Sequence, residues 1–185
     1  MTFKPRSPRK LTSVLFLLAV GFTVSGAVWS ADNTRENFTV HEADGQKVFK
    51  LSDARGKVVA LHFLLKTTCP NCIRHTHTYT TRAPEVPGAI HIFLKPDTEE
   101  EIRAWSVKLN SRYADQSDPD AGLAKRFEIP YGYKFHGQTV HYPALVLLGP
   151  DGKEIFRYVG KSNKDRYPFD DFAARIAELK ESNSD

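Results

Sequence analysis

The stretch that decides the fold is residues 58–72, Val-Val-Ala-Leu-His-Phe-Leu-Leu-Lys-Thr-Thr-Cys-Pro-Asn-Cys. It opens with an apolar run of strand length and ends on Cys69 and Cys72, the only two cysteines of the chain. If the run is a strand and the cysteines open a helix, the two thiols lie one turn apart on the same helix face. The stretch therefore predicts a dithiol that cycles with an intramolecular disulfide.

A helix N-terminus would give the two thiols different roles. Its amide dipoles stabilise a thiolate at Cys69 and lower the pKa of that thiol from ~8.5 into the range of about 3.5–7.5. Lys66 and Arg74 would add positive charge nearby. Cys72 would then attack a mixed disulfide on Cys69 and release the product. An inert structural disulfide is the alternative, but so short a loop contributes little stability, and redox use is favoured.

The N-terminus predicts export. Basic residues within 4–10 precede a stretch without charge, residues 11–29, which is the layout of a secretory signal peptide. The stretch is close to the ~20 residues needed to span a bilayer, so an uncleaved membrane anchor is the alternative. We expect residues 1–31 to be the targeting segment and 32–185 to be one domain. That domain would face an oxidising extracytoplasmic space, the periplasm.

The charge balance argues against nucleic acid as a partner. Residues 1–31 hold four basic and no acidic side chains, so the rest of the chain has 22 basic and 22 acidic residues. A domain without net charge has no general attraction for nucleic acid or for an anionic membrane surface. Anchoring through residues 11–29 is the one membrane interaction that the sequence suggests.

The rest of the chain predicts the elements of one α/β domain. Apolar patterns indicate a hairpin over residues 38–51 and a strand over 88–94. They also indicate a second hairpin over 144–159 and a closing helix over 169–179. The helix after the cysteines, 72–83, is rich in threonine, a weak helix former. We predict it from its position.

Two further helices are indicated by their first residues. Thr98 and Glu101 form a capping box, and Asp118 and Pro119 read as the N-cap and first residue of a shorter helix. The faces expected to be buried carry Ile102, Trp105 and Leu109 in the first helix, and Leu123 and Phe127 in the second. The order of elements predicts a three-layer α/β sandwich with a central mixed β-sheet and an N-terminal β-hairpin extension.

These residues resemble the thioredoxin superfamily and, within it, the redoxin branch. The resemblance rests on the order of elements, the Cys-x-x-Cys after the first long strand, and Tyr142-Pro143 before a strand that ends in Pro-Asp-Gly-Lys. Residues 51–59, Leu-Ser-Asp-Ala-Arg-Gly-Lys-Val-Val, point to the redoxin branch. That branch contains the TlpA/ResA-type periplasmic thiol-disulfide oxidoreductases and the alkyl-hydroperoxide-reductase/peroxiredoxin proteins. The resemblance covers about residues 38–180 and implies a thioredoxin-like fold.

The resemblance also implies roles for single residues. Cys69 is expected to attack, Cys72 to resolve, and Pro143 to be a cis-proline facing them, which leaves the backbone of Tyr142 to pair with an incoming peptide. The substrate-binding set is Thr68, Pro70, Asn71, Tyr142 and Pro143. No cofactor is expected beyond the disulfide between the two cysteines. The implied partners are protein thiols or disulfides and an upstream redox partner.

Three departures from the family pattern concern the substrate. Thr68 replaces the usual aromatic residue before the first cysteine, and Tyr142 is larger than the residue usually found before the proline. A longer connection, residues 130–141, would lie near the site and contribute to partner recognition. These departures affect which substrate is bound and leave the dithiol chemistry unchanged.

Two other functions stay open. A thiol peroxidase with antioxidant activity needs a threonine three residues before its cysteine and a nearby arginine, and Lys66 stands at that spacing from Cys69.

A Cu(I) or Zn carrier would use Cys69, Cys72, His75 and His141. Copper-delivery relatives of the fold carry Cys-x-x-x-Cys, which is one residue longer. The remaining core histidines, His62 and His91, are expected to be partly buried and structural.

Overall fold

The structure is a computed structural model and describes residues 37–43, 45, 47–108 and 115–181. The predicted targeting segment, residues 1–31, lies outside this range, so its cleavage and anchoring stay predictions. Within the described ranges, no helix is both long and apolar enough to cross a membrane.

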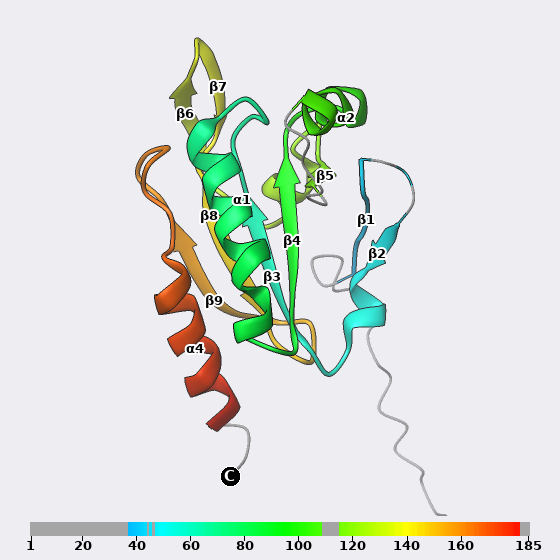
Figure 1. Cartoon of the computed structure of the whole chain (residues 1–185), viewed down its shortest axis with the longest axis vertical. Helices are drawn as coiled ribbons and strands as arrows, with labels where there is room; N and C mark the ends of the chain where they lie inside the picture. Colours follow the sequence, from blue (N-terminus) through cyan, green and yellow to red (C-terminus); the bar gives the residue numbers. More distant parts are fainter. Residues whose placement is uncertain (1–36, 44, 46, 109–114, 182–185) are drawn as a thin grey trace, which may run out of the picture. The chain divides into compact units, whose positions relative to one another are not determined.

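A mixed five-stranded sheet, with strand order β5-β4-β3-β8-β9, forms the middle layer (Figure 1). Its strands are β3 (Val58–Phe63), β4 (Ala89–Lys95), β5 (Asp115–Ser117), β8 (Ala144–Leu148) and β9 (Glu154–Val159). The central strand β3 pairs parallel with β4 and antiparallel with β8. Residues 59–63 of β3 are all buried, as expected of an apolar run with elements on both faces of its sheet.

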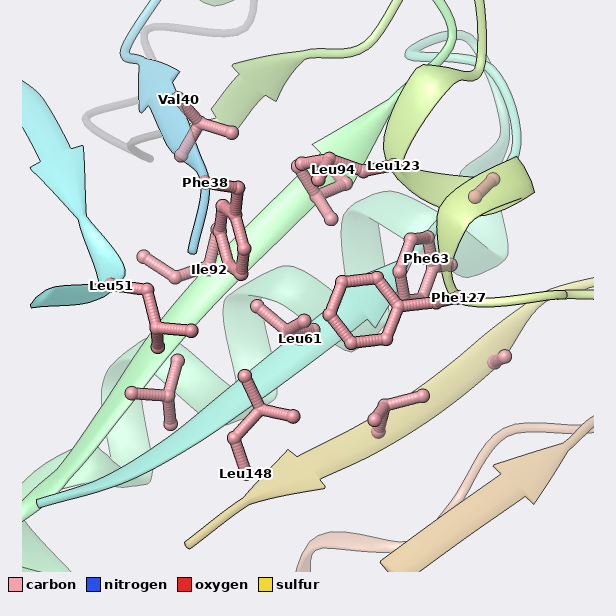
Figure 2. Packing of buried hydrophobic residues seen from close by; sticks show 14 of the residues in the cluster. Phe38, Val40, Leu51, Leu61, Phe63, Ile92, Leu94, Leu123, Phe127 and Leu148 are labelled. Atoms are coloured by element: carbon pink, nitrogen blue, oxygen red, sulfur yellow. The ribbon is translucent and has the colours of Figure 1, made fainter. Parts of the chain in front are cut away.

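Helices and a hairpin cover the two faces of the sheet. The helices are α1 (Pro70–Arg82), α2 (Glu99–Lys108), α3 (Gly122–Arg126) and α4 (Phe169–Glu181), with 3-10 turns η1 (Leu51–Ala54) and η2 (Ala83–Glu85). On one face lie α1 and α4 (Figure 1). They bury Tyr79, Phe172 and Ile176. On the other face, residues of the N-terminal hairpin, η1 and α3 pack over β3 (Figure 2). The predicted three-layer sandwich is confirmed.

The predicted N-terminal hairpin is also present. It consists of β1 (Thr39–His41) and β2 (Val48–Lys50), paired antiparallel. The Ala43 N–H donates to the Asp115 carbonyl at 3.1 Å, which joins the hairpin to the β5 edge of the main sheet. The hairpin therefore helps to cover an edge strand that would otherwise expose unpaired backbone groups.

Local signals located most helix starts correctly. At the start of α2, the Thr98 hydroxyl accepts from the Glu101 N–H at 3.2 Å, and the Glu101 carboxylate accepts from the Thr98 N–H at 2.9 Å. This reciprocal pair is the predicted capping box. Ile102 is buried as expected, whereas Leu109 lies outside the described residues.

The start of α3 differs from the prediction. The helix begins at Gly122, so Pro119 is not its first residue. The backbone first makes a turn in which the Ala121 N–H donates to the Asp118 carbonyl at 2.8 Å. The Asp118 carboxylate reaches over that turn to the N–H groups of Leu123 and Ala124, at 3.1 and 3.2 Å. Asp118 thus accepts hydrogen bonds from the N-terminal N–H groups of α3 as predicted. It lies farther before the helix than an N-cap residue would.

Residues 130–141, predicted only as a longer connection near the site, form a further hairpin. Its strands are β6 (Tyr131–Phe135) and β7 (Gln138–His141), paired antiparallel. The two turn residues, His136 and Gly137, have φ values of 47° and 77°. Two successive residues with positive φ are the requirement of a type I′ turn, which matches the twist of hairpin strands.

Candidate functional site

The two cysteines occupy the N-terminus of α1, as predicted. Cys69 is the N-cap residue, with extended backbone, and its Sγ accepts from the Cys72 N–H at 3.4 Å. Pro70 is the first helical residue, where its fixed φ suits the helix and its missing N–H costs nothing. Both thiols are free and fully buried, whereas Thr68 and Pro70 on either side of Cys69 are exposed.

This geometry drives the pKa values of the two thiols apart. The pKa of Cys69 is lowered to about 6, first by its hydrogen bond with the Cys72 side chain, then by the N–H groups of Cys72 and Asn71 and by the charge of Arg166. Burial raises the pKa of Cys72 well above its ordinary value, and its hydrogen bond to Cys69 adds to that effect. Near neutral pH the pair is therefore one thiolate and one thiol.

The positive charge at the dithiol comes from Arg166, not from the basic residues beside the motif. The Arg166 Nη2 atom lies 3.2 Å from the Cys72 Sγ. Lys66 and Arg74 were expected in this role, but neither contributes to the shift at Cys69. Arg74 is exposed and contacts the Asn71 side chain at 3.5 Å, where water screens its charge.

Arg166 is held by the loop between β9 and α4, residues 160–168. Its Nη1 atom donates to the carbonyls of Ser162 and Asp165 at 3.1 and 3.2 Å. The Asp165 carboxylate in turn accepts from the Lys161 N–H at 2.7 Å and from the Tyr158 hydroxyl. No local sequence pattern signals the contact of Arg166 with a cysteine 94 positions away.

Gly160 allows this loop to fold tightly. A Cβ atom at this position would lie 2.1 Å from the Asp165 carbonyl oxygen and 3.2 Å from the Pro143 ring. The Gly160 N–H also donates to the Pro143 carbonyl at 2.8 Å. The missing side chain thus lets the loop that carries Arg166 pack against the segment before β8.

Pro143 lies in this region, but its peptide bond is not cis. The described residues contain no cis peptide bond, so that prediction was wrong. The trans form is the ordinary preference of an X-Pro bond. Here the flanking backbone is already paired, because the Tyr142 N–H donates to the Pro130 carbonyl and the Pro143 carbonyl accepts from Gly160, both at 2.8 Å. The Tyr142 N–H is therefore not available to a peptide in this conformation.

The β6–β7 hairpin helps to cover the dithiol. Phe135 is buried in the same cluster as Cys69 and Cys72, and Tyr133 and Val140 pack against that cluster. The hairpin stands at the N-terminal end of α1 (Figure 1). The Tyr133 hydroxyl accepts from the Asn163 N–H at 2.9 Å, which connects the hairpin to the Arg166 loop. Both sulfur atoms are buried in this conformation, so a large substrate reaches them only after a local rearrangement.

A cavity of about 490 Å³ is lined in part by residues of β7. The loop before the dithiol contributes Lys66 to its wall, β7 contributes Val140, and the segment after β7 contributes Tyr142. Tyr142, predicted to bind substrate, therefore lines this cavity.

The candidate metal ligands do not form a metal site. His75 Nε2 lies 2.9 Å from His62 Nδ1, and His141 Nδ1 lies 2.7 Å from the Ile129 carbonyl oxygen. No group of three or more candidate ligands within the described part of the chain has metal-binding geometry. The set Cys69, Cys72, His75 and His141 is therefore not assembled.

Comparison with known proteins places the chain in a family. The model of the AhpC/TSA family matches residues 32–154. The chain belongs to the AhpC/TSA family. It is 27% identical over 143 residues to human NHL repeat-containing protein 2. That match covers 72% of this chain but only 17% of the human protein.

Solved structures agree on the fold of this redoxin. One is a secreted disulfide oxidoreductase of Mycobacterium tuberculosis homologous to DsbE of E. coli, with 19% identity, a TM-score of 0.58, and coverage of 79% of this chain and 98% of that one. Another is peroxiredoxin Q of Xanthomonas campestris, with 20% identity, a TM-score of 0.60, and coverage of 77% and 89%. The predicted thioredoxin-like fold and redoxin family are confirmed.

Replacing Arg166 tests the source of the charge at the dithiol. Arg166→Gln should raise the pKa of Cys69, because the thiolate loses a nearby cation. The rate of Cys69 alkylation by iodoacetamide at pH 6 should fall about 3- to 10-fold. Arg74→Gln, which removes an exposed arginine from the same helix, should leave the rate unchanged. Equal effects of the two substitutions would contradict the assignment.

Replacing Gly160 tests the packing of the loop. Gly160→Ala should lower the free energy of unfolding by about 1–3 kcal/mol, because a Cβ there overlaps backbone. Gly122→Ala is the matched control, since the nearest atom to its Cβ is at an ordinary 3.6 Å. Urea unfolding of the two variants measures the difference. A Gly160→Ala protein as stable as the control would mean that the loop is not tightly packed.

Proposed function

We propose that this redoxin is an exported thiol-disulfide oxidoreductase that exchanges disulfides with partner proteins through Cys69 and Cys72. The observation that carries the proposal is the pair of free thiols at one helix N-terminus, whose pKa values are shifted in opposite directions. Such a pair supplies a nucleophile that is ionised near neutral pH and a second thiol that stays protonated until it is needed.

The reaction in the reducing direction has two steps. The Cys69 thiolate attacks one sulfur of the partner's disulfide, so that a mixed disulfide forms and the other partner sulfur leaves as a thiolate. Cys72 then loses its proton and attacks Cys69 Sγ, which forms the intramolecular disulfide and releases the second partner thiolate. The partner gains two electrons, the two departing thiolates take up protons, and an upstream dithiol must reduce the enzyme again. The same steps run in reverse oxidise a partner.

Arg166 would assist the second step. Cys72 is a poor nucleophile while it is protonated, and burial makes its thiolate costly. The guanidinium at 3.2 Å from its Sγ favours the charged form. We propose that Arg166 lowers the cost of generating the Cys72 thiolate when the mixed disulfide is resolved.

Export is part of the proposal. It rests on the signal-peptide layout of residues 1–31, which would place the domain in an oxidising compartment such as the periplasm. The Mycobacterium tuberculosis relative of the same fold is described as secreted. Anchoring through residues 11–29 is the alternative to cleavage.

Thiol peroxidase activity is the second candidate, favoured by Arg166 and by the similarity to peroxiredoxin Q. The Cys69 thiolate would attack one peroxide oxygen, break the O–O bond and become a sulfenic acid, while the leaving oxygen takes a proton. Cys72 would then form the disulfide and release water. The absence of a threonine three residues before Cys69 makes this the weaker candidate.

Serine variants test the proposed exchange. With a disulfide-containing protein substrate, Cys72→Ser should accumulate a mixed disulfide through Cys69, because the resolving thiol is missing. Cys69→Ser should lose at least 100-fold in exchange rate and form no such adduct. Mass spectrometry identifies the adduct and its cysteine. Unchanged exchange by Cys69→Ser would refute the proposal.

A peroxide assay separates the two candidates. The reduced wild-type protein should exchange with protein disulfides quickly and be oxidised by hydrogen peroxide slowly, as ordinary thiols are. Rapid peroxide-dependent oxidation of Cys69, without any protein partner and with negligible exchange, would favour the peroxidase instead.

A further inference from the structure

Three histidines form a hydrogen-bonded chain beneath the dithiol. His62 on β3 lies at the centre, with its Nδ1 atom 2.9 Å from His75 Nε2 on α1 and its Nε2 atom 3.1 Å from His91 Nδ1 on β4. His62 has no exposed surface, and His75 is buried. The Tyr79 ring packs against all three imidazoles. The chain therefore ties α1 to two strands of the sheet.

Counting hydrogens shows how many protons this chain can hold. Three neutral imidazoles carry three N–H hydrogens, and each of the two N···N contacts uses one. The third belongs on an outer nitrogen, His75 Nδ1 or His91 Nε2. His91 Nε2 is buried without a hydrogen-bond partner among the described residues, so it is unsatisfied whether or not it carries that hydrogen.

The count sets a limit on added protons. One extra proton can occupy the remaining outer nitrogen while both N···N hydrogen bonds persist. A second extra proton must place hydrogens on both nitrogens of one contact, and that contact then breaks. The chain can thus be neutral or singly charged, but not doubly charged, without coming apart.

The surroundings oppose even the first proton. Arg166 is the charged group that acts on His75, and it disfavours a second cation. The aromatic rings of Tyr79, Phe93 and Phe172 surround His62 and His91. The charge of Asp171 acts on the Tyr79 hydroxyl, whose pKa it helps to raise.

Burial is the largest cause of the pKa shifts of the three histidines. It lowers the pKa of His75 to about 3, that of His91 to about 4 and that of His62 well below its ordinary value.

We infer that the chain of His75, His62 and His91 positions α1, and that acid releases this helix from the sheet when the chain takes up a second proton. Cys69 is the N-cap of α1 and Cys72 lies in its first turn, so release of the helix would draw Cys72 away from Arg166. Only the consequence for activity, loss of disulfide exchange in acid, rests on the proposed function. The release itself is a property of the fold.

The sign of the pH effect follows from the direction of the shifts. An unfolded histidine titrates near pH 6.5, above the folded values. As the pH falls below about 6.5, the unfolded chain binds more protons than the folded one, and stability is lost. Each of the three imidazoles lowers the folding equilibrium constant by up to about tenfold per pH unit, until its own folded pKa is reached.

Urea unfolding of the reduced protein between pH 7.5 and 4.5 tests the inference. His62→Phe removes the central imidazole and keeps a ring in its place. Between pH 6.5 and 4.5 its folding equilibrium constant should fall about 50-fold less than that of the wild type. His77→Gln is the control, because it removes an exposed histidine from the same helix. A His62→Phe protein with the acid dependence of the wild type would overturn the inference.

A second measurement decides the question if His62→Phe does not fold. Nitrogen-15 spectra of histidine-labelled wild type should show three imidazoles still neutral at pH 5. Below that pH they should charge together with loss of α1 amide protection against hydrogen exchange. Protonation of these imidazoles with α1 still protected would overturn the inference.

Exchange activity at pH 7.5 separates this inference from the proposed function. If the wild type lacks that activity while the acid behaviour is as described, the function fails and the histidine chain stands. If instead the wild type exchanges disulfides at pH 7.5 but does not show the described acid behaviour, the inference about the histidine chain fails and the proposed function stands.

Discussion

The N-terminus of α1 is the constraint on which the site depends. Cys69 lies just outside the helix, so its sulfur can accept the N–H of Cys72. Cys72 lies inside the first turn, where the sheet and the helices bury it. One piece of local geometry thereby lowers the pKa of the first thiol and raises that of the second. Arg166 adds to this local effect, because its charge favours the thiolate form of both sulfur atoms.

Distant parts of the chain complete the site. The loop that follows β9 brings Arg166 to Cys72, and it can do so because Gly160 leaves room for the Asp165 carbonyl. The β6–β7 hairpin adds Phe135 to the buried cluster around the sulfur atoms. Because both thiols are buried, access for a protein partner requires a local rearrangement of the site.

Local sequence patterns predicted the parts of the fold that depend on neighbouring residues. The apolar run before the cysteines predicted a strand, and β3 is buried there. The spacing of Thr98 and Glu101 predicted the capping box that the structure contains. The β6–β7 hairpin was missed, although His136-Gly137 between alternating aromatic residues is a turn signal. The delayed start of α3 was missed because a carboxylate can cap across a turn.

Features that depend on tertiary contacts could not be found in this way. Arg166 is 94 positions from the cysteine that it contacts, and no spacing rule connects them. The trans bond at Pro143 reflects backbone pairing with Pro130 and Gly160, whereas family resemblance favoured cis. The three-histidine chain draws one residue from each of three elements, so its members look like unrelated core histidines in the sequence.

The reduction potential of the Cys69–Cys72 pair tests the central claim most directly. Equilibration with glutathione buffers, followed by quantification of free thiols, should give one reversible two-electron transition between dithiol and intramolecular disulfide. Because the lowered pKa of Cys69 stabilises the reduced form, the potential should lie above the value of about −270 mV typical of thioredoxin. A pair that forms no intramolecular disulfide at any glutathione ratio would contradict the account.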